Sequence, residues 1–230
     1  MTEKAISRTP TVRSFVYREG RMTPGQKRAY TSLNEVYSIN LQKPIDWLNL
    51  FGSSKSITLE IGFGNGQSLV DLAQKNPDQG FVGIEPHRPG IGQLMLALQE
   101  KGISNVRVIE GDAADIVPAR VPKGLIESIL VFFPDPWPKK RHHKRRLLNY
   151  PFIEVLADRL KVDGILHIAT DWDEYAHEIL DAVNCCPYLS NSSSIGKFSQ
   201  RPSSRLLTKY ERRGLTLGHE IFDIIASRTQ

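Results

Sequence analysis

The segment VFFPDPWPKKRHHKRR, residues 131–146, combines the end of a buried strand, a rigid turn and a block of cations. Its apolar start continues the run 129–133, which is typical of a strand covered on both faces. Three prolines follow, and because proline cannot donate to a strand ladder, they end the strand and stiffen the loop. Asp135 and Trp137 are therefore expected at the carboxyl end of a strand, where open α/β sheets bind their ligands.

The block 139–146 carries the excess positive charge of the chain. It holds six Lys and Arg, and the whole chain has 30 Lys and Arg against 25 Asp and Glu, for a net charge of +5. Removing the block would reverse the sign of the net charge, so the excess is local. A run of charge is often only a solvated face. Next to a strand-end carboxylate and an indole, however, it indicates a polyanionic partner and chemistry on a base within a nucleic acid.

Strands and helices alternate along the chain, which predicts a doubly wound, mainly parallel seven-stranded sheet of the Rossmann-like type. We expect strands at 57–61, 81–84, 106–109, 126–133, 165–169 and 221–226, and helices at 24–34, 67–75, 89–100, 150–160 and 172–183. Residues 1–45 are expected to form a basic N-terminal arm with one helix, and 46–230 the main domain. The Ser-rich stretch 190–204 is expected to be a mobile loop.

The compartment is predicted from the cysteines and the apolar runs. Cys185 and Cys186 are adjacent, a spacing that rarely bridges and does not match a zinc site, so both are read as packing thiols in a reducing cytoplasm. The amino terminus lacks the apolar region of a signal peptide, and no apolar run approaches membrane-spanning length. We expect a cytoplasmic protein without a membrane segment.

Three carboxylates lie at or near the ends of the first three strands, and the first of them opens a glycine-rich turn, EIGFGNG (60–66). A dinucleotide fingerprint would need glycine at position 67, where Gln stands. Glu60 suits a cationic ligand such as the ammonium of a methionine moiety, Glu85 can accept from two ribose hydroxyls, and Asp112 can accept from an adenine amino group. This set indicates S-adenosylmethionine. The residues expected to contact it from this pattern are Glu60, Gly62, Gly64, Glu85 and Asp112.

Asp135 and Asp171, each at the end of a strand, are the candidate carboxylates for the chemistry. Methyl transfer from a sulfonium is an in-line displacement that needs alignment more than acid or base. An exocyclic amine must lose a proton, whereas N7 of guanine offers a free lone pair. A carboxylate beside that ring can orient its N1–H and N2–H edge and offset the positive charge of the methylated ring. Trp137 either stacks on a base or plugs the loop, and no metal ligand set is expected.

Five segments resemble the bacterial tRNA (guanine-N7-)-methyltransferases. They are LEIGFGNG (59–66), GIE (83–85), FFPDPWPKKRH (132–142), ATDW (169–172) and TKYE (208–211). The resemblance runs from Arg13-Ser14-Phe15 to the last strand, and the combination of the proline-rich block with TKYE is highly specific. Pro86 and Tyr210 depart from the residues common in the family, without removing a carboxylate.

The resemblance implies methyl transfer from S-adenosylmethionine to N7 of guanosine 46 in the tRNA variable loop. It implies that Glu60, Glu85, Asp112 and Asp135 hold the cofactor and that Asp135 is catalytic. It also implies substrate contacts by Lys139, Asp171, Thr208, Lys209, Tyr210 and Glu211, and RNA contacts by Arg141, His142, His143, Lys144, Arg145 and Arg146. The protein is expected to be a monomer or a homodimer.

Three other functions remain open from the residues alone. An exocyclic-amine methyltransferase of nucleic acid would have a similar Asp-Pro-aromatic loop, but the second proline is missing here and a lysine follows Pro138. A non-catalytic RNA-binding module would not need the three carboxylates, and a small-molecule methyltransferase would leave the basic run without a role.

Overall fold

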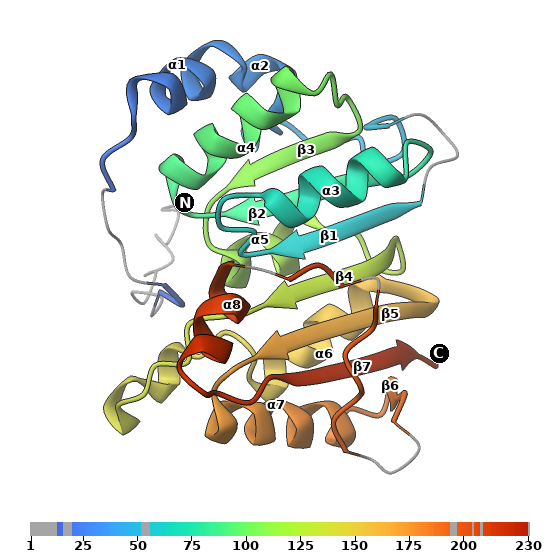
Figure 1. The fold of residues 1–230 in the computed structure, drawn as a ribbon. Coiled ribbons are helices and arrows are strands. Elements are labelled where there is room, and N and C mark those ends of the chain that lie inside the picture. Colours follow the sequence, from blue (N-terminus) through green and yellow to red (C-terminus); the bar gives the residue numbers. More distant parts are fainter. Residues whose placement is uncertain are drawn as a thin grey trace, which may run out of the picture.

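The computed structural model describes residues 13–15, 20–51, 56–193, 197–203, 205–207 and 209–229. Its centre is a seven-stranded sheet with the order β3-β2-β1-β4-β5-β7-β6 (Figure 1). The strands are β1 (Ile57–Ile61), β2 (Gly80–Glu85), β3 (Val106–Glu110), β4 (Ile126–Phe132), β5 (Leu160–Thr170), β6 (Leu189–Asn191) and β7 (Phe222–Arg228). The first five strands pair in parallel and β7 runs antiparallel to both of its neighbours, which confirms the predicted fold class.

Helices cover the sheet and enclose two hydrophobic clusters. They are α1 (Pro24–Ser32), α2 (Asn34–Tyr37), α3 (Gln67–Lys75), α4 (Arg88–Glu100), α5 (Ala113–Arg120), α6 (Tyr150–Arg159), α7 (Asp173–Cys185) and α8 (Lys209–Thr216), with a 3-10 helix η1 (Lys140–Arg145). One cluster joins α5, α6 and α7 to the sheet, and the other joins α1 to α4 to it. Because both faces are covered, every residue of β1 and β2 is buried.

Local sequence explains where the helices begin. Thr23 and Gln26 form a capping box at the start of α1, with Pro24 in its first turn. Asn149 caps α6 through the Phe152 N–H, as its position before Tyr150-Pro151 predicts. The buried positions of α3 are Leu69, Val70 and Ala73, the stripe expected from the sequence.

Five elements, α2, α5, α8, η1 and β6, are absent from the sequence-based expectations. Helix α5 contains Pro118, which argues against a helix in any pattern-based reading. Helix α8 has few apolar residues and η1 consists of Lys, Arg and His alone. β6 is a short edge strand that overlaps the beginning of the stretch 190–204. Residues 194–196 and 204 of that stretch lie outside the described residues, so the predicted mobile loop is not tested there.

The described part of the N-terminal arm packs against the sheet and its helices. Helix α1 lies on α4 at the β3 edge of the molecule (Figure 1). The Ile39 N–H donates to the Val108 carbonyl at 2.8 Å, which attaches the segment after α2 to β3. Within the described ranges no helix is long and apolar enough to cross a membrane.

Candidate active site

A cavity of about 630 Å³ lies at the carboxyl ends of β1 to β4. Five of the six residues expected to contact the cofactor line it: Gly62, Gly64, Glu85, Asp112 and Asp135. The sixth, Glu60, lines a neighbouring cavity of about 800 Å³ between α3 and the segment that leads into α8. Gly62, Asn65, Phe132 and Phe133 line both cavities, so the two are separated only by the glycine-rich turn and the end of β4.

The glycine-rich turn requires glycine because its backbone has positive φ angles and because α4 packs closely against it. Gly62, Gly64 and Gly66 have φ values of 73°, 59° and 76°, a region that favours glycine. A Cβ on Gly90, in the first turn of α4, would lie 2.0 Å from the Gly64 carbonyl oxygen. At this point the backbone of the turn and the backbone of the helix are in direct contact, and the other side of the turn faces the cavity.

Glu85 holds the turn and faces the cavity. Its Oε2 accepts the Gly64 N–H at 2.9 Å and its Oε1 accepts the His87 N–H at 3.0 Å. Burial raises the pKa of Glu85 to about 7, against the effect of these two hydrogen bonds, and the nearby Asp135 carboxylate adds to the rise. Each oxygen can still accept a further bond, as ribose hydroxyls would require.

Glu60 is a buried carboxylate at the end of β1. Its Oε2 has no hydrogen-bond partner within the described residues, and burial raises the pKa of Glu60 to about 8. A buried, unpartnered carboxylate oxygen is costly unless a positive ligand compensates it. The side chain thus fits the ammonium of a methionine moiety, and the three acceptors Glu60, Glu85 and Asp112 fit S-adenosylmethionine.

Asp112 has partners that the sequence alone did not reveal. It caps α5 through the Ala114 N–H, and it also accepts the backbone N–H of Ser14 at 3.1 Å and its hydroxyl at 2.7 Å. Ser14 and Phe15 line the cavity as well, so the arm forms part of its wall. The one sequence feature that pointed there is the start of the family resemblance at Arg13-Ser14-Phe15.

The loop after β4 is rigid, and it presents Asp135 to the cavity. Phe133 and Trp137 have φ values of 55° and 46°, and prolines follow both residues. The Trp137 Nε1–H donates to the Ser14 carbonyl at 3.0 Å, and the Arg145 guanidinium lies 5.0 Å from the indole centroid. Trp137 thus makes contacts within the protein, which favours a structural role in the loop over stacking on a base.

The basic block separates into outward and inward cations. Lys139, Lys140, Arg141 and Lys144 are exposed, whereas the side chain of Arg146 is only 2% exposed. The Arg146 Nη1 lies 2.6 Å from the Glu178 Oε2 and its Nη2 lies 3.7 Å from the Glu174 Oε2. This geometry argues against phosphate contact by Arg146.

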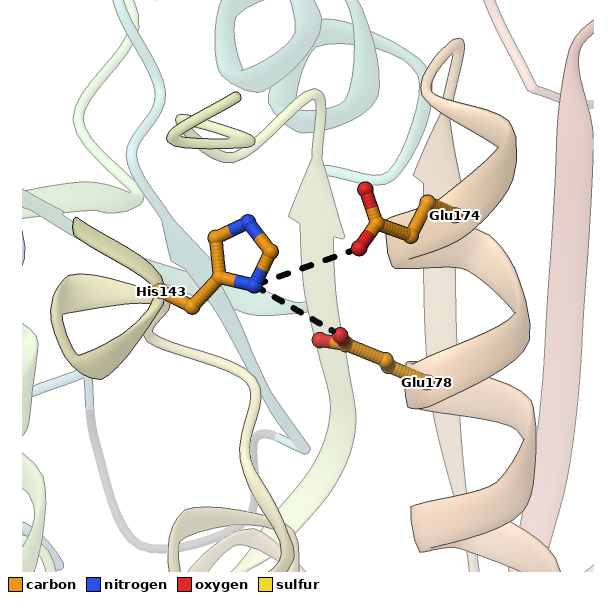
Figure 2. A group of neighbouring side chains, drawn as sticks. All are labelled: His143, Glu174 and Glu178. Carbon is orange, nitrogen blue, oxygen red and sulfur yellow. Dashed lines mark ion pairs between the residues drawn. The ribbon is translucent and has the colours of Figure 1, made fainter. Parts of the chain in front are cut away.

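His143 approaches the same two carboxylates from η1 (Figure 2). Its Nδ1 lies 3.9 Å from an oxygen of Glu174 and 3.9 Å from an oxygen of Glu178. Three such groups can in principle hold a metal ion. Arg146 already supplies a cation to both carboxylates, so we read the cluster as the contact that docks η1 on α7.

The residues expected to contact substrate from the carboxyl-terminal half lie around α8, which stands at the carboxyl ends of β4 and β5 (Figure 1). Asp171 is half-buried and lies against α8, where a Cβ on Gly214 would be 3.0 Å from its Oδ2. Glu211 is buried and pairs with Arg205 and Arg201, which argues against direct substrate contact. Thr208 and the side chains of Lys209 and Tyr210 lie outside the described residues.

Comparison with known proteins identifies the family to which the chain belongs. A family model described as "Putative methyltransferase" matches residues 54–224. A tRNA (guanine-N(7)-)-methyltransferase of Methylococcus capsulatus is 44% identical over 100% of both chains, and that of Aliivibrio salmonicida is 44% identical over 93% of this chain and 90% of its own. The solved 16S rRNA methyltransferase KamB is 14% identical, with a TM-score of 0.62 over 85% of this chain and 99% of its own, which shows a shared fold.

The sheet order, the glycine-rich turn and the carboxylates at successive strand ends define a class I methyltransferase. The family match and the relatives then narrow this class. The chain belongs to the tRNA (guanine-N(7)-)-methyltransferase family.

Proposed function

We propose that this protein transfers a methyl group from S-adenosylmethionine to N7 of guanosine 46 in the variable loop of tRNA. The observation that carries the proposal is the position of Asp135, which lines the same cavity as Glu85 and Asp112 and lies four residues before the exposed Lys139. This position supports the proposal, because the Asp135 carboxylate would then lie between the bound cofactor and a nucleotide held at the cationic surface. The names of the relatives support the choice of tRNA and of N7.

The cofactor would supply an electrophilic methyl group on a sulfonium. Glu60 would hold its ammonium, Glu85 its ribose hydroxyls and Asp112 its adenine end. The glycine-rich turn brings backbone close to the ligand without Cβ contact. These contacts fix the direction of the methyl group, which an in-line displacement needs most.

Asp135 would act on the guanine without removing a proton from N7. Its carboxylate accepts hydrogen bonds from the N1–H and N2–H edge, which orients the base. It also offsets the positive charge that the ring acquires during transfer. Lys139, at the lip of the loop, would contact the target nucleotide.

The exposed cations Lys140, Arg141 and Lys144 would bind phosphates of the tRNA. His142 lies on the same turn, where burial and the neighbouring cations lower its pKa, so it contributes little charge at neutral pH. We place the enzyme in the cytoplasm, where its proposed tRNA substrate is found.

The test is nucleoside analysis. Unmodified tRNA is incubated with the protein and S-adenosylmethionine carrying a labelled methyl group, then digested, and the nucleosides are identified by mass spectrometry and chromatography against standards. We expect 7-methylguanosine. Label in N2-methylguanosine or N6-methyladenosine would instead support the exocyclic-amine alternative, and no transfer together with normal tRNA binding would support a binding module.

A further inference from the structure

A buried ionic network lies beside the active site, outside the residues that the proposed chemistry uses. The Arg205 side chain is 1% exposed and lies between two carboxylates, Glu211 and Asp223, that are also 1% exposed. Its Nη1 and Nη2 donate to the two oxygens of Glu211 at 2.7 and 2.9 Å. Its Nε and Nη2 lie 2.8 and 3.0 Å from the two oxygens of Asp223.

The network joins elements that are far apart in the chain. Asp223 belongs to β7 and contacts the Nε2 of His167 on β5 at 2.7 Å. Glu211 belongs to the first turn of α8, and Arg201 adds a second contact to it at 3.0 Å. One pair of guanidinium contacts therefore binds Glu211 at the start of α8, and the other pair binds Asp223 on β7. Arg205 thus links α8 to the sheet.

The guanidinium also packs beneath the wall between the two cavities. Its Cζ lies 5.7 Å from the ring centroid of Phe132 and 6.0 Å from that of Phe133. Both phenylalanines line both cavities, and Pro134-Asp135 follows them directly. Leu206 and Leu207, next to Arg205, line the cavity that also holds Glu60.

We propose that Arg205 is a positioning residue, which holds Leu206, Leu207, the start of α8 and the end of β4 in place so that the target nucleotide meets Asp135 in the correct orientation. In this role Glu211 acts through Arg205 and not by touching the substrate, because its side chain is only 1% exposed and its oxygens face arginines inside the protein. The inference rests on the proposed function. The inference gives Arg205 a role in methyl transfer although its side chain is buried.

Arginine is required at this position by geometry. Only a planar guanidinium can make two forks to two carboxylates at once, whereas lysine offers a single ammonium. Arg205→Lys keeps the buried charge and loses the forks, so it loosens the segment without leaving two carboxylates uncompensated. Misplacement of reacting groups by about 1 Å can cost on the order of a hundredfold in rate.

The test is a double-mutant cycle on single-turnover methyl transfer, with enzyme in excess over tRNA and cofactor saturating. Wild type, Arg205→Lys, Glu211→Gln and the double variant are compared. Lys161→Ala is the control, because it removes an ion pair with Glu127 whose side chains are 42% and 49% exposed and lie outside the network. Melting temperature, S-adenosylmethionine affinity and tRNA affinity are measured for each variant. A role in fold stability alone would move only the melting temperature.

We expect each of the two network variants to lose about tenfold or more in the transfer rate, with cofactor affinity near wild type and the double variant no slower than the slower single variant. Lys161→Ala should stay within about twofold of wild type. Rate losses that simply multiply in the double variant would mean that Glu211 acts on the substrate independently of Arg205. A wild-type rate for Arg205→Lys would also overturn the proposal. If Arg205→Lys fails to fold, the proposal is tested by the transfer rate and the cofactor affinity of Glu211→Gln. A wild-type transfer rate in Glu211→Gln would also overturn the proposal. A wild type that makes no 7-methylguanosine would refute the proposed function itself, and this is checked first.

Discussion

The structure makes opposite predictions for two kinds of cation within the same basic block. Lys140 and Lys144 are exposed on η1, whereas Arg146 is buried against Glu178 and Glu174. If the lysines neutralise tRNA phosphates, each contact adds about 0.7–0.9 to the slope of log affinity against log salt. Replacing both by Ala should therefore lower the slope by roughly 1.4–1.8. Over a fourfold rise in salt, wild type should then lose roughly 7- to 12-fold more affinity than the double variant does.

Arg146→Met is the matched control for this experiment. It should leave the salt slope unchanged, because its guanidinium does not face solvent. It should lower stability by about 1–3 kcal/mol, since it removes a buried ion pair whose carboxylates are half-exposed and can be rehydrated. For a chain of this length that loss corresponds to roughly 2–12 °C in melting temperature.

The assay is a salt titration of tRNA binding, for example by fluorescence anisotropy, with melting measured in parallel. Equal slopes for wild type and Lys140→Ala/Lys144→Ala would mean that the block is only a solvated face. A slope that falls in Arg146→Met as much as in a single lysine variant would show that Arg146 turns outward when RNA binds.

Three further predictions concern the cavity. Asp135→Asn keeps the shape but not the charge of the side chain, so the rate of methyl transfer should fall by about a hundredfold or more while cofactor affinity changes little, and near wild-type turnover would contradict the electrostatic role. Burial raises the pKa of Glu60 to about 8, so raising the pH from about 6 to about 8.5 ionises it and should strengthen binding of the cationic cofactor. Calorimetry in two buffers of different ionisation enthalpy should then detect proton release when the cofactor binds. Glu60→Gln should flatten the rise of S-adenosylmethionine affinity at the upper end of this pH range. An unchanged pH profile in Glu60→Gln would show that Glu60 does not contact the ammonium. Glu85→Ala removes an acceptor for two hydroxyls, worth roughly 1.5–3 kcal/mol, so S-adenosylmethionine affinity should fall about tenfold to a hundredfold, and an equal loss of tRNA affinity would contradict the division into cofactor and RNA sites.

Patterns that depend on neighbouring residues could be predicted from the sequence. Short runs rich in Ile, Leu, Val and Phe predict β1 and β4, because both faces of a parallel sheet are covered. The glycine-rich turn and the carboxylates after β2 and β3 follow from the same logic, since parallel strands end at one edge of the sheet. Helix α5 was missed because Pro118 lies inside it.

Contacts between distant residues could not be predicted in this way. Ser14 meets Asp112 across 98 positions, and no local pattern marks that pairing. Similarly, nothing within the basic block distinguishes Lys144 from Arg146, because the difference is set by two carboxylates on α7. Glu211 looks like a free acid in the sequence and becomes a buried partner of Arg205 only in the folded protein.

The central claim is that N7 of one guanine accepts the methyl group, and a single-atom change in the substrate tests it most directly. Two otherwise identical tRNAs are prepared, one with guanosine at position 46 and one with 7-deazaguanosine, which keeps the N1, N2 and O6 edge but has no lone pair at position 7. Both are offered to the enzyme with labelled S-adenosylmethionine, and bound tRNA is measured alongside. We predict equal binding, stoichiometric methyl transfer to the guanosine tRNA, and none to the 7-deaza tRNA. Transfer of label to the 7-deaza tRNA would contradict the account.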